Sequence, residues 1–284
     1  MTLYDQHLHS RHSFDCRTEP AANVKAALAR GLAGLTFTEH FDTHPDEWED
    51  CVYDDEAYSA TIRQLREEYG DRIFIGKGIE VCYQPHRMDF ILDFLASHEF
   101  DLVLLSVHYF GDKPVHVKEA WQGLSVEDGL RRYFDYMLRA VNFCRDLHGR
   151  GGRVFDVLSH LDFVKRYTKR FFGTDDVSCC ADLIDQILST CIEADLIPEI
   201  NTSTLRQNLD ETMPGDQTVI RYGQLGGKAM SLGSDAHTGE GVGTGFDKAL
   251  SMLTAAGIDR LAVFKNRQRE DVLFPREKAE DVHV

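Results

Sequence analysis

The chain has 284 residues, 43% hydrophobic and 27% charged, which allows one large α/β domain with a full core. Its net charge of −16 disfavours duplex nucleic acid as a partner, because that much negative charge repels a phosphate backbone. A small phosphorylated ligand remains possible, since bound cations and a few local arginines can make the potential inside one pocket positive.

Targeting signals and cysteine chemistry are absent from the sequence pattern. No apolar run reaches the roughly 18 residues of a membrane span, and the first residues lack the basic and apolar regions of a signal peptide. The seven cysteines are odd in number, scattered and without a CxxC pair. This pattern favours reduced thiols in a cytoplasmic protein over disulfides or a cysteine zinc site.

Short β-rich runs alternate with helix-period segments from one end of the chain to the other. We predict strands at 3–6, 35–38, 72–81, 102–107, 154–159, 197–201 and 229–232, with a weak one at 261–264. Between them we predict helices near 20–30, 54–69, 86–98, 125–148, 176–194, 215–226 and 246–256. The clearest is 125–148, where Ser125 and Asp128 form a capping pattern ahead of one apolar stripe.

The repeated β–α units predict a parallel sheet. Seven or eight such units favour a closed barrel, and a doubly wound open sheet is the alternative. The sequence has no internal repeat and no linker rich in Pro, Gly or Ser, so we predict a single domain over 1–284.

Nearly every predicted strand ends in a histidine or an acid followed by a loop. In a parallel barrel these carboxyl ends open onto one face, where such folds place their chemistry. The strand-end residues, in chain order, are His7, His9, His40, Glu80, His108, His160, Glu199, Asn201, Asp235 and His237. A single histidine of this kind is weak evidence, but a whole series of them predicts a metal site.

The residue types suit zinc, iron or manganese, because imidazole and carboxylate are ligands of all three. His7 and His9 flank one residue, so both side chains point the same way on an extended strand. Asp235 and His237 repeat this spacing.

These motifs resemble the PHP (polymerase and histidinol phosphatase) domain family, and they match it in order and spacing across residues 5–237. The resemblance is greatest to the stand-alone histidinol-phosphate phosphatases, through stretches 156–162 and 201–206. The motifs are Asp5-Gln6-His7-Leu8-His9-Ser10, Thr38-Glu39-His40, Gly78-Ile79-Glu80, Ser106-Val107-His108, Ser159-His160 and Gly233-Ser234-Asp235-Ala236-His237.

The resemblance implies a distorted (β/α)7 TIM-like barrel that holds up to three metals. It assigns the first metal to His7, His9, Glu80 and Asp235 and the second to Glu80, His108 and His160. It assigns the third to Asp15, His40 and His237. Asp15 stands where many histidinol-phosphate phosphatases carry histidine, and His12 lies nearby as an alternative ligand. An oxygen ligand at that position shifts the preference toward manganese or iron.

Such a site suits phosphomonoester hydrolysis. A carboxylate such as Glu80 holds two cations close together, and a water between them becomes the nucleophile near neutral pH. The cations also stabilise the charge of an in-line displacement. The leaving alkoxide takes its proton from a second water, Asp235 or His237, and the sequence leaves these three open.

Arginine is the side chain best shaped to hold the remaining phosphate oxygens. We therefore predict substrate contacts from Arg206, Arg166 and Arg17, each of which is otherwise an ordinary surface cation. Asn201 either contacts the substrate or caps the strand-end turn. Glu39 is expected to orient a ligand from behind. The basic cluster 165–170 is otherwise read as a solvated face.

Three functions follow as hypotheses. The first is a phosphoric monoester hydrolase that converts L-histidinol phosphate to histidinol in histidine biosynthesis. The second is a phosphoesterase of the same fold that acts on another small phosphate ester or a nucleotide. The third is a metal-binding regulatory domain without turnover, which the complete ligand set disfavours. The oligomeric state is left open.

Overall fold

The computed structural model describes residues 2–44, 51, 53–111, 113–207 and 209–274. Its strands are β1 (Tyr4–Leu8), β2 (Gly34–Phe41), β3 (Phe74–Cys82), β4 (Leu102–Ser106), β5 (Val157–Leu158), β6 (Ile197–Asn201), β7 (Ala229–Gly233), β8 (Arg260–Lys265) and β9 (Gln268–Leu273). Its helices are α1 (Pro20–Ala29), α2 (Asp55–Tyr69), α3 (Met88–Ser97), α4 (Val126–His148), α5 (Lys165–Phe172), α6 (Ala181–Ala194), α7 (Asp216–Gln224) and α8 (Phe246–Ala255).

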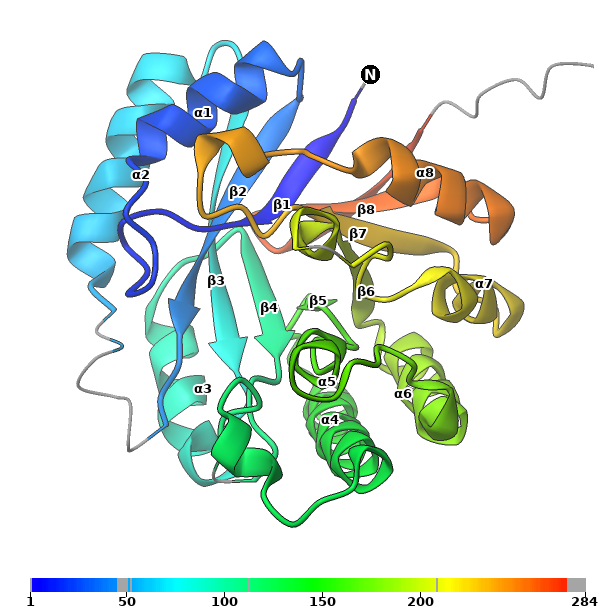
Figure 1. Cartoon of the computed structure of the whole chain (residues 1–284). Coiled ribbons are helices and arrows are strands. Elements are labelled where there is room, and N and C mark those ends of the chain that lie inside the picture. Colours follow the sequence, from blue (N-terminus) through cyan, green and yellow to red (C-terminus); the bar gives the residue numbers. More distant parts are fainter. Residues whose placement is uncertain (1, 45–50, 52, 112, 208, 275–284) are drawn as a thin grey trace, which may run out of the picture.

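The strands lie side by side in chain order, and each pair from β1–β2 to β7–β8 is parallel. In Figure 1 the strands occupy the middle of the molecule and the helices lie around them. A doubly wound sheet reverses its strand order at a switch point, and this sheet does not. The eight predicted strands are therefore confirmed as one parallel series, and the open doubly wound alternative is wrong.

The first strand returns to the last parallel strands. Leu8 forms a parallel bridge with Ala236, just after β7, and the Asp235 amide donates to the His7 carbonyl at 2.6 Å. In the middle of β1 the side chain of Gln6 bonds the backbone of Ala262 and Phe264 in β8, both at 2.7 Å. Among the described residues these contacts take the place of a full ladder between β1 and the strands β7 and β8. The sheet thus curls into the distorted TIM-like barrel that the sequence predicted.

The interior of the barrel is apolar at one end and polar at the other. A cluster of seven buried side chains comes from β4 to β8, namely Leu102, Leu104, Val157, Ile197, Ala229, Ala262 and Phe264. Leu104 is the register partner of Glu80, so both side chains face the same side of the sheet. The apolar cluster therefore lies beneath Glu80 and leaves the carboxyl ends of the strands for polar chemistry.

Two elements were missed by the sequence analysis. Helix α5 is only eight residues long and begins at a residue without a side-chain cap, so it gives no start signal. The interpretation of 165–170 as a solvated face is wrong for Lys165, which is 1% exposed because its ammonium bonds Asp162 and the Thr212 carbonyl. Strand β9 pairs antiparallel with β8 through a turn at Asn266 and Arg267, whose φ angles of 48° and 61° are unusual for non-glycine residues.

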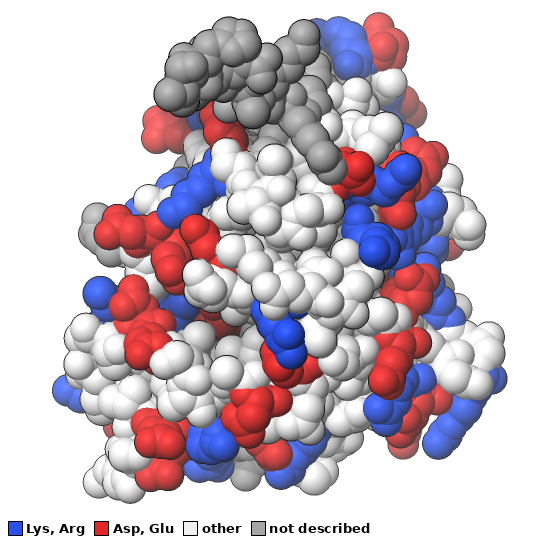
Figure 2. All heavy atoms as spheres, turned by 90° about the vertical axis from the view of Figure 1, so that its right-hand side faces the viewer, with Lys and Arg blue, Asp and Glu red and all other residues white. Residues whose placement is uncertain are grey.

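The surface and the helices add two further facts. On the face drawn in Figure 2, acidic and basic side chains are interspersed. Among the described helices none combines the length and the apolar character that crossing a membrane requires. No disulfide forms among the described residues, and Cys16, Cys82, Cys144, Cys179, Cys180 and Cys191 carry free thiols.

Candidate metal centre

All nine predicted ligands lie together at the carboxyl ends of the strands. His7 and His9 come from the end of β1, His40 from β2 and Glu80 from β3. The other ligands follow β4, β5 and β7 directly, and Asp15 reaches the group from the loop after β1. Buried histidines and acids are rare without partners, so this concentration needs a chemical explanation.

The first group surrounds a point between β1, β3 and the end of β7. His9 Nε2 lies 3.4 Å from Asp235 Oδ1 and 3.6 Å from Glu80 Oε2, while His7 Nε2 lies 3.4 Å from Glu80 Oε2. All four side chains are buried, and His7 Nε2, His9 Nε2 and Glu80 Oε2 have no hydrogen-bond partner. Lone pairs that converge without a proton to share fit a cation.

Glu80 also faces a second group with its other oxygen. Oε1 lies 2.8 Å from His160 Nε2 and 3.4 Å from His108 Nε2. One carboxylate thus points Oε1 at His108 and His160 and Oε2 at His7 and His9, and Oε2 also lies 2.9 Å from His40 Nδ1. This is the arrangement of a bridging ligand between two cations.

The third group is formed by Asp15, His40 and His237. Asp15 Oδ2 lies 3.1 Å from His237 Nε2 and 3.5 Å from His40 Nε2. His12 instead contacts Thr61 on α2 at 2.9 Å. Asp15, and not His12, therefore faces the cluster in this structure.

The geometry defines four sets of three side chains whose ligand atoms all lie within 4.8 Å of one another. Three of them combine predicted ligands: His7, His9 and Asp235; His7, Glu80 and His160; and His9, His40 and His237. The fourth adds Asp42 to His40 and His108. Asp42 was not predicted as a ligand, although its place two residues after His40 on an extended segment puts both side chains on one side.

Burial lowers the pKa of the imidazoles, but neighbouring carboxylates outweigh it and raise the pKa of His7, His40, His108 and His237, so a cation has to displace protons from these four. His9 is different. Burial lowers the pKa of His9 to about 3, and the neighbouring His40 and His237 add to the effect. His9 is therefore neutral, which is the form that ligates. Burial raises the pKa of Glu80, but the positive charges of His7, His108 and His40 outweigh it and hold that pKa well below 4.5. Glu80 is therefore an ionised carboxylate.

Carboxylates behind the ligands hold the far nitrogens of three imidazoles. Glu39 accepts from Ser13 Oγ at 2.6 Å, and Ser13 Oγ lies 3.1 Å from His9 Nδ1, which gives Glu39 the orienting place that the sequence suggested. Asp42 Oδ2 lies 3.2 Å from His108 Nδ1, and Glu199 Oε1 lies 2.8 Å from His7 Nδ1. The sequence analysis assigned neither of these last two roles. The only signal for Glu199 was its position at the end of β6.

A cavity of about 540 Å³ opens over this cluster. Its lining residues include several of the predicted ligands, together with Tyr109 and a row from α5 and the loop before it, Phe163, Arg166, Tyr167 and Arg170. The Arg166 guanidinium donates to Asp235 Oδ2 at 3.1 Å and to Ser203 Oγ, and it lies 5.0 Å from the centre of the Phe163 ring. Helix α5, which the sequence did not reveal, thus supplies two arginines of the pocket, Arg166 and Arg170, of which Arg166 contacts a predicted ligand.

The other predicted substrate contacts lie elsewhere. Arg206 donates to the carbonyls of Ser234 at 2.6 Å and Asp235 at 3.3 Å, so it holds the turn that carries Asp235 at a φ of 50°. Arg17 is exposed and donates to the carbonyls of Phe14 and Cys16. Asn201 is buried, and its Oδ1 accepts from the Ser203 amide, which is the turn-capping role. None of the three is among the described residues that line the metal pocket.

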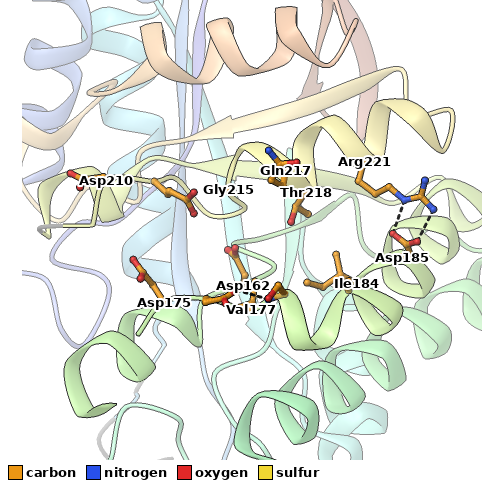
Figure 3. Close-up of a pocket in the computed structure, with 14 residues that line it drawn as sticks. Asp162, Asp175, Val177, Ile184, Asp185, Asp210, Gly215, Gln217, Thr218 and Arg221 are labelled. Atoms are coloured by element: carbon orange, nitrogen blue, oxygen red, sulfur yellow. Dashed lines mark hydrogen bonds and ion pairs between the residues drawn. The ribbon is translucent and has the colours of Figure 1, made fainter. Parts of the chain in front are cut away.

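A second cavity, of about 500 Å³, lies between the segments 175–185 and 210–221. Figure 3 shows Asp162, Asp175 and Asp210 around it, while Arg221 is paired with Asp185 at 2.6 Å. Its described lining contains no histidine and no predicted ligand. The cavity over the histidine cluster is therefore the one in which metal chemistry belongs.

A parallel α/β barrel with clustered imidazoles and carboxylates at the carboxyl ends of its strands defines a metal-binding hydrolase of the barrel type. The PHP domain pattern matches residues 5–203, and the chain belongs to the PHP domain family. The resemblance drawn from the motifs is thereby confirmed.

Relatives within the family agree over nearly the whole length. The chain is 28% identical over 264 residues to the histidinol-phosphatase of Lactococcus lactis subsp. lactis, covering 93% of this chain and 95% of the relative. It is 27% identical over 256 residues to a probable histidinol-phosphatase of Clostridium acetobutylicum, covering 88% and 92%. A crystal structure of histidinol phosphate phosphatase from L. lactis, complexed with zinc, L-histidinol and phosphate, matches with a TM-score of 0.81 and 28% identity, covering 95% of this chain and 99% of that one.

Proposed function

We propose that the chain is a metal-dependent phosphomonoesterase that hydrolyses L-histidinol phosphate to L-histidinol and phosphate, a step of histidine biosynthesis. The single observation that carries the proposal is Glu80, whose two oxygens face two separate histidine groups beneath a pocket that contains an arginine. The Lactococcus relative, whose structure holds L-histidinol and phosphate, supports the choice of substrate.

The residues fit two or three divalent cations of zinc, manganese or iron. We propose His7, His9, Glu80 and Asp235 for the first, Glu80, His108 and His160 for the second, and Asp15, His40 and His237 for the third. When bound, the cations supply Lewis-acid stabilisation of the phosphoryl oxygens and an activated water. The buried imidazole of His9 is neutral and can therefore bind a metal without first losing a proton.

The chain's own groups then bind and orient the ester. Arg166 is 13% exposed, and its partner Asp235 Oδ2 fixes the guanidinium at the edge of the cluster. A planar guanidinium in that place holds phosphoryl oxygens and lowers their charge as the bond to the leaving group breaks. Arg206, Arg17 and Asn201 stay proposed substrate contacts, although the protein itself uses their polar atoms here. A water, Asp235 and His237 remain the proposed proton donors to the leaving alkoxide. His237 Nδ1 lies 3.6 Å from Asp235 Oδ1, and Asp235 would first have to take up a proton, since its pKa is held well below 3.8.

The pocket also has room for the organic half of the substrate. Its volume of about 540 Å³ lies in the usual range for a small ligand, and aromatic rings from Phe14, Phe163 and Tyr167 line it. Another small phosphate ester or a nucleotide is the alternative, favoured by the exposed Asp15 at the third group. We also propose that the chain forms one catalytic domain and acts in the cytoplasm.

The first experiment compares kcat/KM for L-histidinol phosphate with a panel of other phosphomonoesters and one phosphodiester, using manganese-reconstituted protein. We expect histidinol phosphate to exceed the others by about 10³ or more, equivalent to roughly 4 kcal/mol of transition-state discrimination. Faster turnover of another ester would keep the metal chemistry and remove this substrate. No turnover at all, with metals bound, would favour the regulatory-domain hypothesis.

A further inference from the structure

We infer that Glu199, Asn201 and Ser203 form a positioning network that fixes two metal ligands and the pocket arginine in one arrangement. The three residues follow one another at the end of β6, and none of them lines the metal pocket among the described residues. The inference rests on the metal site of the proposed function but not on its substrate. We call these three residues the β6 network.

Glu199 contacts ligands assigned to two different metals. Its Oε1 lies 2.8 Å from His7 Nδ1, and its Oε2 accepts from the His160 backbone amide at 2.8 Å and from Asn201 Nδ2 at 3.2 Å. The carboxylate is 1% exposed, so no solvent competes for these bonds. One side chain thereby sets the distance between β1, which carries His7, and the end of β5, which carries His160.

Gly233 makes room for this contact. A Cβ atom at that position would lie 1.9 Å from Glu199 Oε1 and 2.5 Å from His7 Cβ, much closer than real atoms approach. The φ angle of Gly233 is not in the left-handed region, so the glycine is required by space. The absence of a side chain at Gly233 on β7 therefore leaves the space that the Glu199 carboxylate occupies when it bonds His7.

The network continues from Glu199 to the pocket arginine. Asn201 Oδ1 accepts from the Ser203 hydroxyl and from the Ser203 amide, and Ser203 Oγ accepts from Arg166 Nη2. Arg166 in turn donates to Asp235 Oδ2 at 3.1 Å. A continuous series of bonds thus runs from the metal ligand His7 to Arg166 and back to the metal ligand Asp235.

Every bond to Glu199 requires an acceptor. The His160 amide and Asn201 Nδ2 are fixed donors, and His7 must carry its proton on Nδ1 if Nε2 is to bind a metal. Glutamine cannot satisfy all three, because one of its two terminal atoms is an NH₂ group. If the amide oxygen serves His160 and Asn201, the NH₂ faces His7 Nδ1 and forces the proton onto Nε2. That tautomer does not ligate.

The test is metal binding by Glu199→Gln, without substrate. Metal-free protein is titrated with Mn²⁺ or Zn²⁺ in competition with a chromophoric chelator. We expect the affinity of the tightest site to fall by about 10- to 100-fold. The matched control is Asp156→Asn, because Asp156 is also a fully buried carboxylate that accepts a backbone amide, from Val103 at 2.9 Å, but lies at the opposite end of β5. Metal affinity of the control should stay within about twofold.

A second variant tests the far end of the network. Ser203→Ala removes the hydroxyl that accepts from Arg166 but touches no metal ligand. We expect the Kd of the metal-loaded protein for inorganic phosphate to rise about 10- to 100-fold, the factor that a hydrogen bond to a charged group typically contributes. Metal affinity should not change. Ser203→Thr keeps the hydroxyl and should restore phosphate binding.

Imidazole ¹⁵N shifts of the Zn²⁺-loaded protein decide the matter for His7. Wild type should show a metal-bound Nε2 and a proton on Nδ1, and Glu199→Gln should lose the metal-bound Nε2 signal of His7. Wild-type metal affinity and an unchanged tautomer in Glu199→Gln would overturn the role of Glu199. Wild-type phosphate affinity in Ser203→Ala would overturn the link to Arg166. Neither result depends on whether histidinol phosphate is the substrate.

Discussion

In the proposed function, Arg166 is the residue through which the pocket adds charge stabilisation to that of the metals. Its guanidinium sits between Ser203 and Asp235, over the Phe163 ring. Lysine keeps the charge but not the planar fork, so Arg166→Lys should lower kcat/KM by about 10²- to 10³-fold, as removal of one preorganised donor does. Steady-state kinetics with metal-saturated protein measure the change. Arg139→Lys, at a surface pair with Asp135 on α4, should leave kcat/KM as in wild type.

Most of the proposed metal ligands could be predicted from the sequence because they stand at the polar end of an apolar run, whereas Asp15, in the loop after β1, came only from the family resemblance. His7, His40 and Glu80 interrupt patterns that otherwise read as buried strand, and the parallel order of the strands brings such ends together. The residues behind them could not be predicted in the same way. Glu199 and Asp42 act through contacts 192 and 66 residues away in sequence, and only the barrel shows which imidazole each one faces.

At the scale of elements, the carboxylate of Asp55 connects the first turn of α2 to the sheet. Asp55, in the first turn of α2, bonds Lys77 on β3 at 2.7 Å, Tyr53 at 2.9 Å and Ser59 at 3.1 Å. Burial raises the pKa of Asp55, but the bonds from Lys77 and Tyr53 outweigh it and leave that pKa below 3.8. The carboxylate therefore stabilises the fold in its ionised form. Its position at the N-terminus of α2 adds to this, because the helix dipole favours a negative charge there.

Asp55→Asn should lower the free energy of unfolding by about 1–2 kcal/mol at pH 7. Because the folded pKa is depressed, the stabilisation is present above the unfolded value of about 3.9 and is lost as pH falls through the folded one. Urea unfolding at pH 7 and near pH 3 measures both arms, and a pH-independent difference would contradict the ionic account. Glu56→Gln, at the exposed neighbouring position, should change stability by less than about 0.5 kcal/mol.

The elements that the sequence hid share a physical cause. Helix α5 is short and has no side-chain cap. Lysine is usually exposed, so Lys165 obscures the amphipathic pattern of the helix, because its ammonium is buried against Asp162. Strand β9 has no buried side chain, only exposed and half-buried ones, and its turn uses Asn266 and Arg267 in place of glycine. Tertiary contacts, such as Arg267 with Asp156 at 2.6 Å, stabilise what local propensity does not.

At the scale of the whole molecule, the barrel concentrates buried charge at one end. The chain has a net charge of −16. Two of its ionised carboxylates, Glu80 and Asp235, are buried in the metal cluster, while the cluster of side chains beneath Glu80 is apolar. Bound cations neutralise these carboxylates and occupy lone pairs that have no other partner. The folded state should therefore be strongly linked to metal concentration.

Removal of metal should lower the melting temperature. At a free metal concentration of about 100 Kd, one site adds about 2.7 kcal/mol of stability, and for a chain of this size each kcal/mol moves Tm by about 2–4 °C. Chelation should therefore lower Tm by roughly 5–10 °C per tightly bound ion, and readdition of Mn²⁺ or Zn²⁺ should restore it. Calorimetry of the same sample before and after chelation gives the shift, and a titration with Mn²⁺ should move Tm with the logarithm of its concentration.

Since Asp15 gives the third group an oxygen ligand, Asp15→His should raise the effect of Zn²⁺ on Tm relative to that of Mn²⁺. A melting temperature that ignores metal would mean that the cluster is satisfied by its own hydrogen bonds, and the metal centre would have to be abandoned.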